Sequence, residues 1–180
     1  MSHNRVDKYC ASVTLLLLAG CSSAHLATVP RIPASLRAPD TQRLLQVVRA
    51  EGAQIYQCRN TQAPAIGFNW VFTAPEATLF TASGRRFGKH YAGPTWEATD
   101  GSKVTGTLLA RDPGPDPSAI PWLLLRASTG SDRGTLAHVA TIQRLATAGG
   151  QAPAGGCNAA TVNQSVRVPY QAQYWFYVVR

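Results

Sequence analysis

Apolar residues recur at every second position in segments after residue 52, and this alternation constrains the fold more than any other feature of the chain. In the segment 68–73, for example, Phe68, Trp70 and Phe72 are separated by single residues. A period of two predicts β-strands with one buried face. Glycine-bearing turns at short spacing separate the segments, as they do in antiparallel sheets. Strands are predicted at 53–58, 68–73, 77–82, 86–91, 94–98, 102–110, 121–128, 136–143 and 172–179.

One stretch has a helical spacing instead. Asp40 suits an N-cap, the apolar residues of 44–48 recur at helical intervals, and Gly52 suits the end of a helix. We therefore expect one helix over Thr41–Glu51. The expected fold is mainly β: a single antiparallel β-sandwich or barrel-like domain over residues 40–180, with one N-terminal helix.

The first 20 residues have the layout of a secretory signal. Arg5 and Lys8 form a basic start, and an apolar run too short to span a membrane follows. The run ends in Leu18-Ala19-Gly20-Cys21, which looks like the lipobox of bacterial lipoproteins. This resemblance implies that residues 1–20 are a cleaved signal peptide. It also implies that the sulfur of Cys21 carries the lipid anchor.

The residues after this cysteine are small and polar, and three prolines within 21–39 prevent a continuous helix. We expect 21–39 to be the lipidated N-terminus and a flexible tether. Ser22 and Ser23 follow Cys21, whereas lipoproteins held at the inner membrane often carry Asp there. The expected location is therefore the bacterial cell envelope, as an outer-membrane lipoprotein that faces the periplasm.

That compartment is oxidising, which changes the interpretation of the remaining thiols. Cys10 lies in the leader, so the mature chain keeps Cys58 and Cys157 as a pair beyond the anchor. We predict a disulfide between them. Two isolated cysteines make a poor zinc site, and no Cys-x-x-Cys motif is present to support redox catalysis.

The window 88–102 holds more groups able to bind or react than any other. Its Asp100-Gly101 pair marks a hairpin turn, and the hydrophobic pattern sets the register. A three-residue loop, with Gly101 at the left-handed position of a bulge, places Glu97 opposite Lys103 and Trp96 opposite Val104. One face is then apolar with Trp96 inward, and the other carries an ion pair.

Two interpretations of this window remain open. The preceding hairpin sends Arg86, Gly88 and His90 to one side, so His90 is expected near Glu97, where the pair could act as acid and base. Arg86, Tyr91, Trp96 and Lys103 are the candidate binding residues. The more ordinary interpretation is a solvated polar face of the sheet.

His138, which shares an alternating segment with Leu136 and Ile142, is expected to be a hydrogen-bonded core histidine.

Charge and motifs exclude several other functions. The formal charge is +8, but the arginines are scattered along the chain, so we expect no nucleic-acid partner. No histidine has close acidic or histidine neighbours at metal-ligand spacing, and no metal site is expected. The sequence lacks a Gly-x-Ser-x-Gly elbow, a phosphate-binding glycine loop and a dinucleotide motif, so no cofactor is expected.

Several segments also carry a family resemblance: Gly52–Cys58, Ala74–Ala77, Gly88–Glu97, Ile120–Leu125, Ile142–Arg144 and Val168–Tyr170. Through them the chain, from Gly52 to Tyr177, resembles a family of uncharacterised secreted or lipid-anchored proteins of bacteria and fungi. The role of that family is unknown, so the resemblance implies no activity.

These observations lead to one expected function and one alternative. We expect an envelope lipoprotein whose β-domain binds a protein partner or a cell-surface or cell-wall glycan. The membrane is then a partner through the lipid on Cys21. The alternative is a periplasmic hydrolase or isomerase that uses His90 and Glu97 as acid and base.

Overall fold

Several strands are longer than the sequence pattern predicts, and the two strands predicted at 68–73 and 77–82 form one. The structure is a computed structural model that describes residues 31–62 and 66–180. Within these residues it contains eight β-strands and one turn of 3-10 helix, and no α-helix. The elements are η1 (Ala34–Leu36), β1 (Gln42–Thr61), β2 (Gly67–Phe80), β3 (Arg86–Tyr91), β4 (Thr95–Ala98), β5 (Lys103–Asp112), β6 (Trp122–Thr129), β7 (Val139–Gly149) and β8 (Ser165–Val179).

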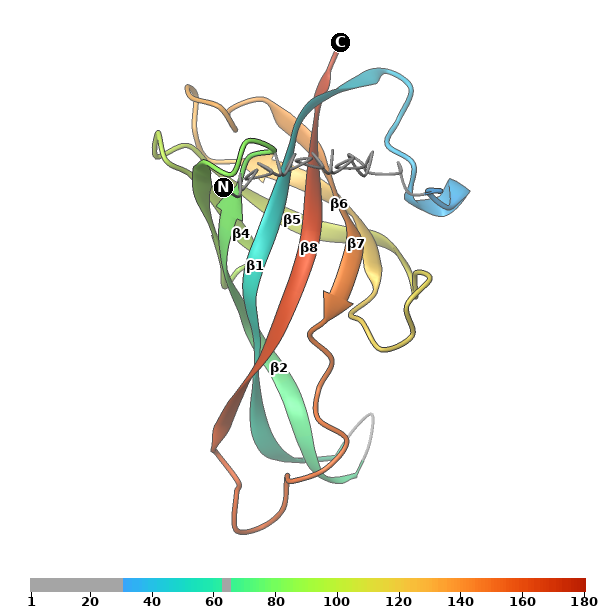
Figure 1. The fold of residues 1–180 in the computed structure, drawn as a ribbon, viewed down its shortest axis with the longest axis vertical. Coiled ribbons are helices and arrows are strands. Elements are labelled where there is room, and N and C mark those ends of the chain that lie inside the picture. The colour runs from blue at the N-terminus through green and yellow to red at the C-terminus, as the bar shows by residue number, and fades with distance from the viewer. Residues whose placement is uncertain (1–30, 63–65) are drawn as a thin grey trace, which may run out of the picture.

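All eight strands form one antiparallel sheet that closes on itself. Each strand pairs with the next one along the chain, and β8 returns to pair with β1. Each described strand therefore has a paired neighbour on both sides for part of its length, although β2 before Ala77 is not paired with β3. Strands β1, β2 and β8 continue beyond the shorter strands at the lower end of Figure 1.

The apolar inner face holds the main core. Trp96 and Phe176 lie there with 1% and 0% of their surface exposed, and their rings meet edge to face. The alternation of β8 explains the arrangement, because its even-numbered residues from Tyr170 to Val178 are all buried while their neighbours are not. All eight strands contribute residues to this core: Val48, Ala50, Ala77, Leu79, Phe87, Trp96, Ala98, Val104, Leu125, Val139, Ile142, Tyr170, Ala172, Tyr174 and Phe176.

A smaller cluster lies on the outer face of β6 and β7, where Leu36 of the 3-10 turn packs against Trp122, Leu124 and Leu145. Leu36 is fully buried, and its carbonyl accepts a hydrogen bond from Nε2 of Gln143. Of the segment expected to be a tether, Ile32 and Leu36 therefore pack on the domain. Residues 21–30 lie outside the described residues.

The helix predicted over Thr41–Glu51 is wrong, because this segment is the first half of β1. A β-bulge between Leu44 and Gln46 makes Leu45 an extra residue in the strand. Leu45 packs on the inner core with Val48, whereas Leu44 and Val47 are paired with β8 residues of the outer face. The bulge thus puts apolar residues three positions apart on each face, Leu44 with Val47 and Leu45 with Val48, and this spacing is also typical of a helix.

The hairpin predicted around Asp100 is confirmed in register. Glu97 lies opposite Lys103, Trp96 lies opposite Val104, and Gly101 has a φ of 84°. The Asp100 carboxylate fixes the turn further: it accepts hydrogen bonds from the backbone and hydroxyl of Ser102 and from those of Thr135. These four bonds hold the β4–β5 turn against the loop that leads to β7.

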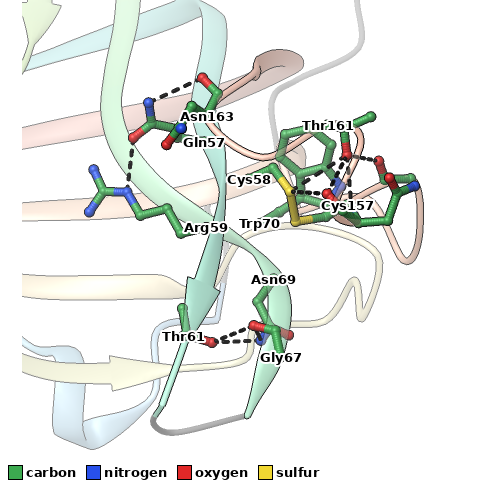
Figure 2. Close-up of a disulfide and its surroundings, with 12 residues drawn as sticks. Gln57, Cys58, Arg59, Thr61, Gly67, Asn69, Trp70, Cys157, Thr161 and Asn163 are labelled. Atoms are coloured by element: carbon green, nitrogen blue, oxygen red, sulfur yellow. Dashed lines mark hydrogen bonds between the residues drawn. A yellow bond between two sulfur atoms is a disulfide. The ribbon is translucent and has the colours of Figure 1, made fainter.

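The disulfide between Cys58 and Cys157 is confirmed, with a Cα–Cα distance of 5.3 Å. Figure 2 shows that it joins β1 to the long loop between β7 and β8. The same loop is held by Trp70, whose Nε1 donates to the carbonyl of Gly155 at 2.8 Å. The disulfide therefore closes the end of the domain where β1 and β2 extend furthest.

The predicted signal peptide, residues 1–20, and the predicted lipidation site, Cys21, lie outside the described residues. Among the residues that the structure does describe, no helix is long and apolar enough to cross a membrane. Signal peptide and lipid anchor stay predictions from the sequence.

Candidate functional site

The outer face of β3, β4 and β5 carries a cluster of four polar side chains centred on Glu97. The Tyr91 hydroxyl donates a hydrogen bond of 2.7 Å to Oε2 of Glu97. The ammonium groups of Lys89 and Lys103 each lie 3.4 Å from a Glu97 oxygen. Lys89 is opposite Glu97 in β3 and Lys103 is opposite it in β5, so the register of both hairpins creates the cluster.

These contacts favour the ionised form of Glu97. Donation by the Tyr91 hydroxyl, and then the hydrogen bond and positive charge of Lys103, lower the pKa of Glu97 below its ordinary value. The same hydrogen bond raises the pKa of Tyr91. Glu97 is therefore a carboxylate at neutral pH that holds a hydroxyl and two ammonium groups in place.

Two hollows of the outer surface meet at Tyr91. One, of about 510 Å³, has a charged lining that includes Glu51, Glu76, Lys89 and Arg167. Arg167 and Glu76 form a bidentate ion pair across it, with distances of 2.8 and 3.0 Å. The other hollow, of about 390 Å³, has a lining of lysine, threonine and serine: Lys103, Thr105, Ser128 and Thr129.

His90 lies on the opposite side of the sheet, in the core. It is 3% exposed, and its ring stacks on Trp96 with 4.3 Å between ring centroids. Tyr174 meets both rings edge to face. Three aromatic side chains from β3, β4 and β8 thus form one packed group inside the closed sheet.

The hydrogen bonding of His90 defines its protonation. Nδ1 lies 2.8 Å from the carbonyl oxygen of Thr95, and a carbonyl can only accept, so Nδ1 carries the proton. Burial lowers the pKa of His90 to about 3, and the charge of Arg144 acts in the same direction. The ring is therefore neutral, and Nε2 is an acceptor.

His90 and Glu97 are not brought together, contrary to the expectation from sequence. His90 is opposite Trp96 on the inner face, whereas Glu97 is opposite Lys89 on the outer face. A bulge at Phe87 explains the difference, because it lets both Phe87 and His90 face inward while strict alternation would turn His90 outward. The two side chains cannot exchange a proton directly.

The other predicted site residues fall into different places. Tyr91 and Lys103 lie on the outer face and line hollows there, and their binding role stays a prediction. Trp96 is buried in the core, so its ring is not a surface platform. Arg86 is exposed at the far end of β3 and lines neither hollow. His138 is exposed rather than buried, because residues 135–138 form a turn and β7 begins only at Val139.

Sequence reasoning missed a group of inward-facing polar side chains near His90. They are Gln54 of β1, Arg144 of β7 and Tyr174 of β8. One signal was present: Arg144 follows Ile142 by two residues, so an alternating strand places a charged residue on its buried face. A charge at a core position is rare unless it is paired or functional. In the described part of the chain, no three His, Cys, Asp or Glu side chains gather as metal ligands would.

The geometry defines a class: an all-β domain with a closed eight-stranded antiparallel sheet, an outer polar cluster and a polar group in the core. A family model described as protein of unknown function (DUF3455) matches residues 39–178, and the chain belongs to that family. A search of curated proteins and a search of solved structures each returned no match.

Proposed function

We propose that this chain is a lipoprotein of the bacterial outer membrane, held by lipid on Cys21, whose β-domain binds a cell-wall or cell-surface glycan without catalysis. The leader that ends in Leu-Ala-Gly-Cys supports a lipid anchor on Cys21. Because Ile32 and Leu36 already pack on the domain, only a short segment separates Cys21 from it in the sequence. Periplasm-facing orientation and secretion rest on the same leader. Of the two sheet forms that the sequence allows, the closed strand order favours the barrel-like one.

The observation that carries the binding function is the position of Tyr91 between two hollows, one with charged side chains and one with hydroxyl and lysine side chains in its lining. Sugars bind to proteins through an aromatic ring beside groups that exchange hydrogen bonds with hydroxyls. Tyr91 supplies the ring, and Lys89 lies on one side of it at 5.3 Å from the centroid. Lys103, Thr105 and Ser128 supply hydrogen-bonding groups in the adjoining hollow.

The fixed geometry of the cluster suits binding better than catalysis. Glu97 uses its oxygens on Tyr91, Lys89 and Lys103, which already occupy it as a hydrogen-bond acceptor. A carboxylate with a lowered pKa is a weak general base, and His90 is not available to it. The hydrolase or isomerase alternative therefore has no support in the positions of these two residues.

The test is sedimentation of the purified mature protein with insoluble cell-wall glycan. We expect Tyr91→Ala to reduce the bound fraction strongly and Lys103→Ala to reduce it moderately. Arg86→Ala is the matched control, since Arg86 is an exposed cation on the same strand outside both hollows. Equal binding by all four proteins would contradict the proposal. So would cross-linking in cells that captures one specific protein through Tyr91.

The anchor is tested separately. Cys21→Ala should move the protein from the membrane fraction to the soluble fraction, and the mature wild-type protein should have the mass of a lipidated N-terminus. An unlipidated wild-type N-terminus would contradict this part of the proposal and leave the glycan test unaffected.

A further inference from the structure

A cavity of about 120 Å³ lies inside the closed sheet, beside the stacked rings of His90 and Trp96. Exposed Phe72 and Pro94 stand among its lining residues and mark where it reaches the surface. It lies where the sheet is least regular, since the stretch of β2 before Ala77 has no partner in β3. His90 lines both this cavity and the hollow of about 510 Å³, whereas the hollow of about 390 Å³ shares no lining residue with the cavity.

Two of the side chains that line this cavity each carry a buried hydrogen-bond donor that has no partner among the described residues. The donors are Nε1 of Trp96 and Nε2 of Gln54, in side chains that are 1% and 2% exposed. A buried donor without an acceptor costs about 1–3 kcal/mol, so native proteins rarely keep one without a reason. Two such donors beside one cavity indicate a molecule that brings acceptor atoms.

The charge of the lining has one sign. Arg144 is its only charged side chain, and no acidic residue contributes to it. The guanidinium donates from Nε and Nη2 to the carbonyl of Pro121, at 3.0 and 2.8 Å, and it has five N–H groups in all. None of the ion pairs among the described residues includes Arg144. His90 is neutral, so it does not add to or offset this charge.

We propose that this cavity binds a small carboxylate with a compact apolar body. The carboxylate accepts hydrogen bonds from the Trp96 indole and the Gln54 amide and is attracted by the Arg144 guanidinium. Besides the neutral ring of His90, the remaining lining groups are aromatic, aliphatic or proline side chains, and the apolar body packs among them. These groups are Phe72, Pro75, Pro94, Leu123, Leu125 and the ring of Tyr174.

The size of the cavity sets the scale of this ligand. A water molecule takes about 30 Å³ of liquid volume, so the cavity corresponds to roughly four waters. This space admits a short-chain or single-ring acid and excludes a glycan chain. The inner site and the proposed glycan surface therefore take different ligands, and each can fail without the other.

The experiment uses the indole N–H of Trp96 as its reporter in ¹⁵N-labelled mature protein. Acetate, butyrate and benzoate are titrated in parallel with acetamide, butyramide and benzamide, which match them in size and lack the charge. We expect at least one carboxylate to move the Trp96 Nε1–H resonance downfield in a saturable manner, with its amide at least about tenfold weaker.

Variants then test the role of the guanidinium. Arg144→Gln should weaken the bound carboxylate at least about tenfold, and Arg144→Lys should have a smaller effect because it keeps the charge. Arg126→Gln, an exposed arginine on β6, is the control and should change nothing. If Arg144→Gln fails to fold, the comparison of acids with amides in the wild type still decides the matter.

Four outcomes would overturn the proposal. One is a Trp96 resonance that no carboxylate moves, which would leave only water to satisfy the two donors. Another is equal binding of acids and amides, which would remove the role of charge. The third is inorganic phosphate binding in place of every carboxylate. The last is an equal loss of affinity in Arg144→Gln and Arg126→Gln.

Discussion

Reduction of the disulfide is the perturbation whose effect the structure defines best. Cys58 and Cys157 are 99 residues apart in sequence, so the bond closes a loop of about 100 residues in the unfolded chain. In the chain-entropy model such a loop contributes about 4–5 kcal/mol to the free energy of unfolding. For a domain of this size, that corresponds to a fall in melting temperature of about 10–20 °C on reduction.

The native contacts around the bond indicate that the loss arises in the unfolded state. Backbone hydrogen bonds join Cys58 to the loop on both sides, from Cys58 N to Gln164 O at 2.9 Å and from Asn163 N to Cys58 O at 2.8 Å. The Tyr56 hydroxyl also donates to the carbonyl of Gly150 at 2.6 Å. The loop between β7 and β8 is therefore held by other bonds, and reduction should leave the folded structure in place.

The assay is urea unfolding of oxidised protein, reduced protein and the Cys58→Ala/Cys157→Ala variant. The reduced protein should be less stable by about 4–5 kcal/mol, with a larger dependence on urea because its unfolded chain is more expanded. The alanine variant should lose slightly more, since Cys58 is fully buried and its truncation removes packing. A loss below about 1 kcal/mol with native spectra in all three proteins would refute this reasoning.

Three further predictions concern the sheet and its titrating groups. Gly88→Ala should lower the melting temperature severely, because a Cβ at this position would lie 2.0 Å from the carbonyl oxygen of Glu97. Gly130→Ala is the control and should have little effect, because a Cβ there would have no atom of another residue within 4 Å. Glu97→Gln should reduce stability to urea at pH 7 and have less effect at pH 3. The reason is that a carboxylate with a lowered pKa loses its contribution to stability as the pH falls through that pKa. An equal loss of stability at pH 7 and pH 3 would count against a stabilising role of the ionised Glu97. Burial lowers the pKa of His90 to about 3, against 6.5 in the unfolded chain, so the free energy of unfolding should fall as pH drops from 6.5 toward 3. The contribution of His90 to this slope is at most about 1.4 kcal/mol per pH unit. His90→Phe should flatten the slope, and a His90 NMR signal that titrates near pH 6.5 would contradict the prediction.

Features controlled by local chemistry could be predicted from the sequence. The Asp100-Gly101 pair defines one turn, and only one register around it separates apolar from polar side chains. For this reason the pairing of Trp96 with Val104 and of Glu97 with Lys103 was predicted correctly. The disulfide was predicted from the pair of thiols left in the mature chain and from the oxidising compartment that the leader predicts. The all-β class followed from the period of two.

Features that depend on irregularities in the sheet could not be predicted. A bulge changes which face a side chain occupies, and nothing in the residues of 44–48 marks Leu45 as the extra one. The same segment has a better local fit to a helix. Pairing with β8 along nearly the whole of β1 overrides that preference, because a closed sheet needs this strand to join its two ends.

The bulge at Phe87 has the larger consequence for function. Strict alternation from the buried Phe87 would place His90 outside, next to Glu97, and would make the outer cluster resemble an acid–base pair. The extra residue turns His90 inward, where it stacks on Trp96 and leaves Glu97 to Tyr91 and the two lysines. One irregularity thus separates the outer polar cluster from the inner cavity lined by Arg144. The two faces of the same hairpin, β3–β4, then carry the two proposed sites, which differ in chemistry: one for a hydroxyl-rich ligand outside and one for a small anion inside.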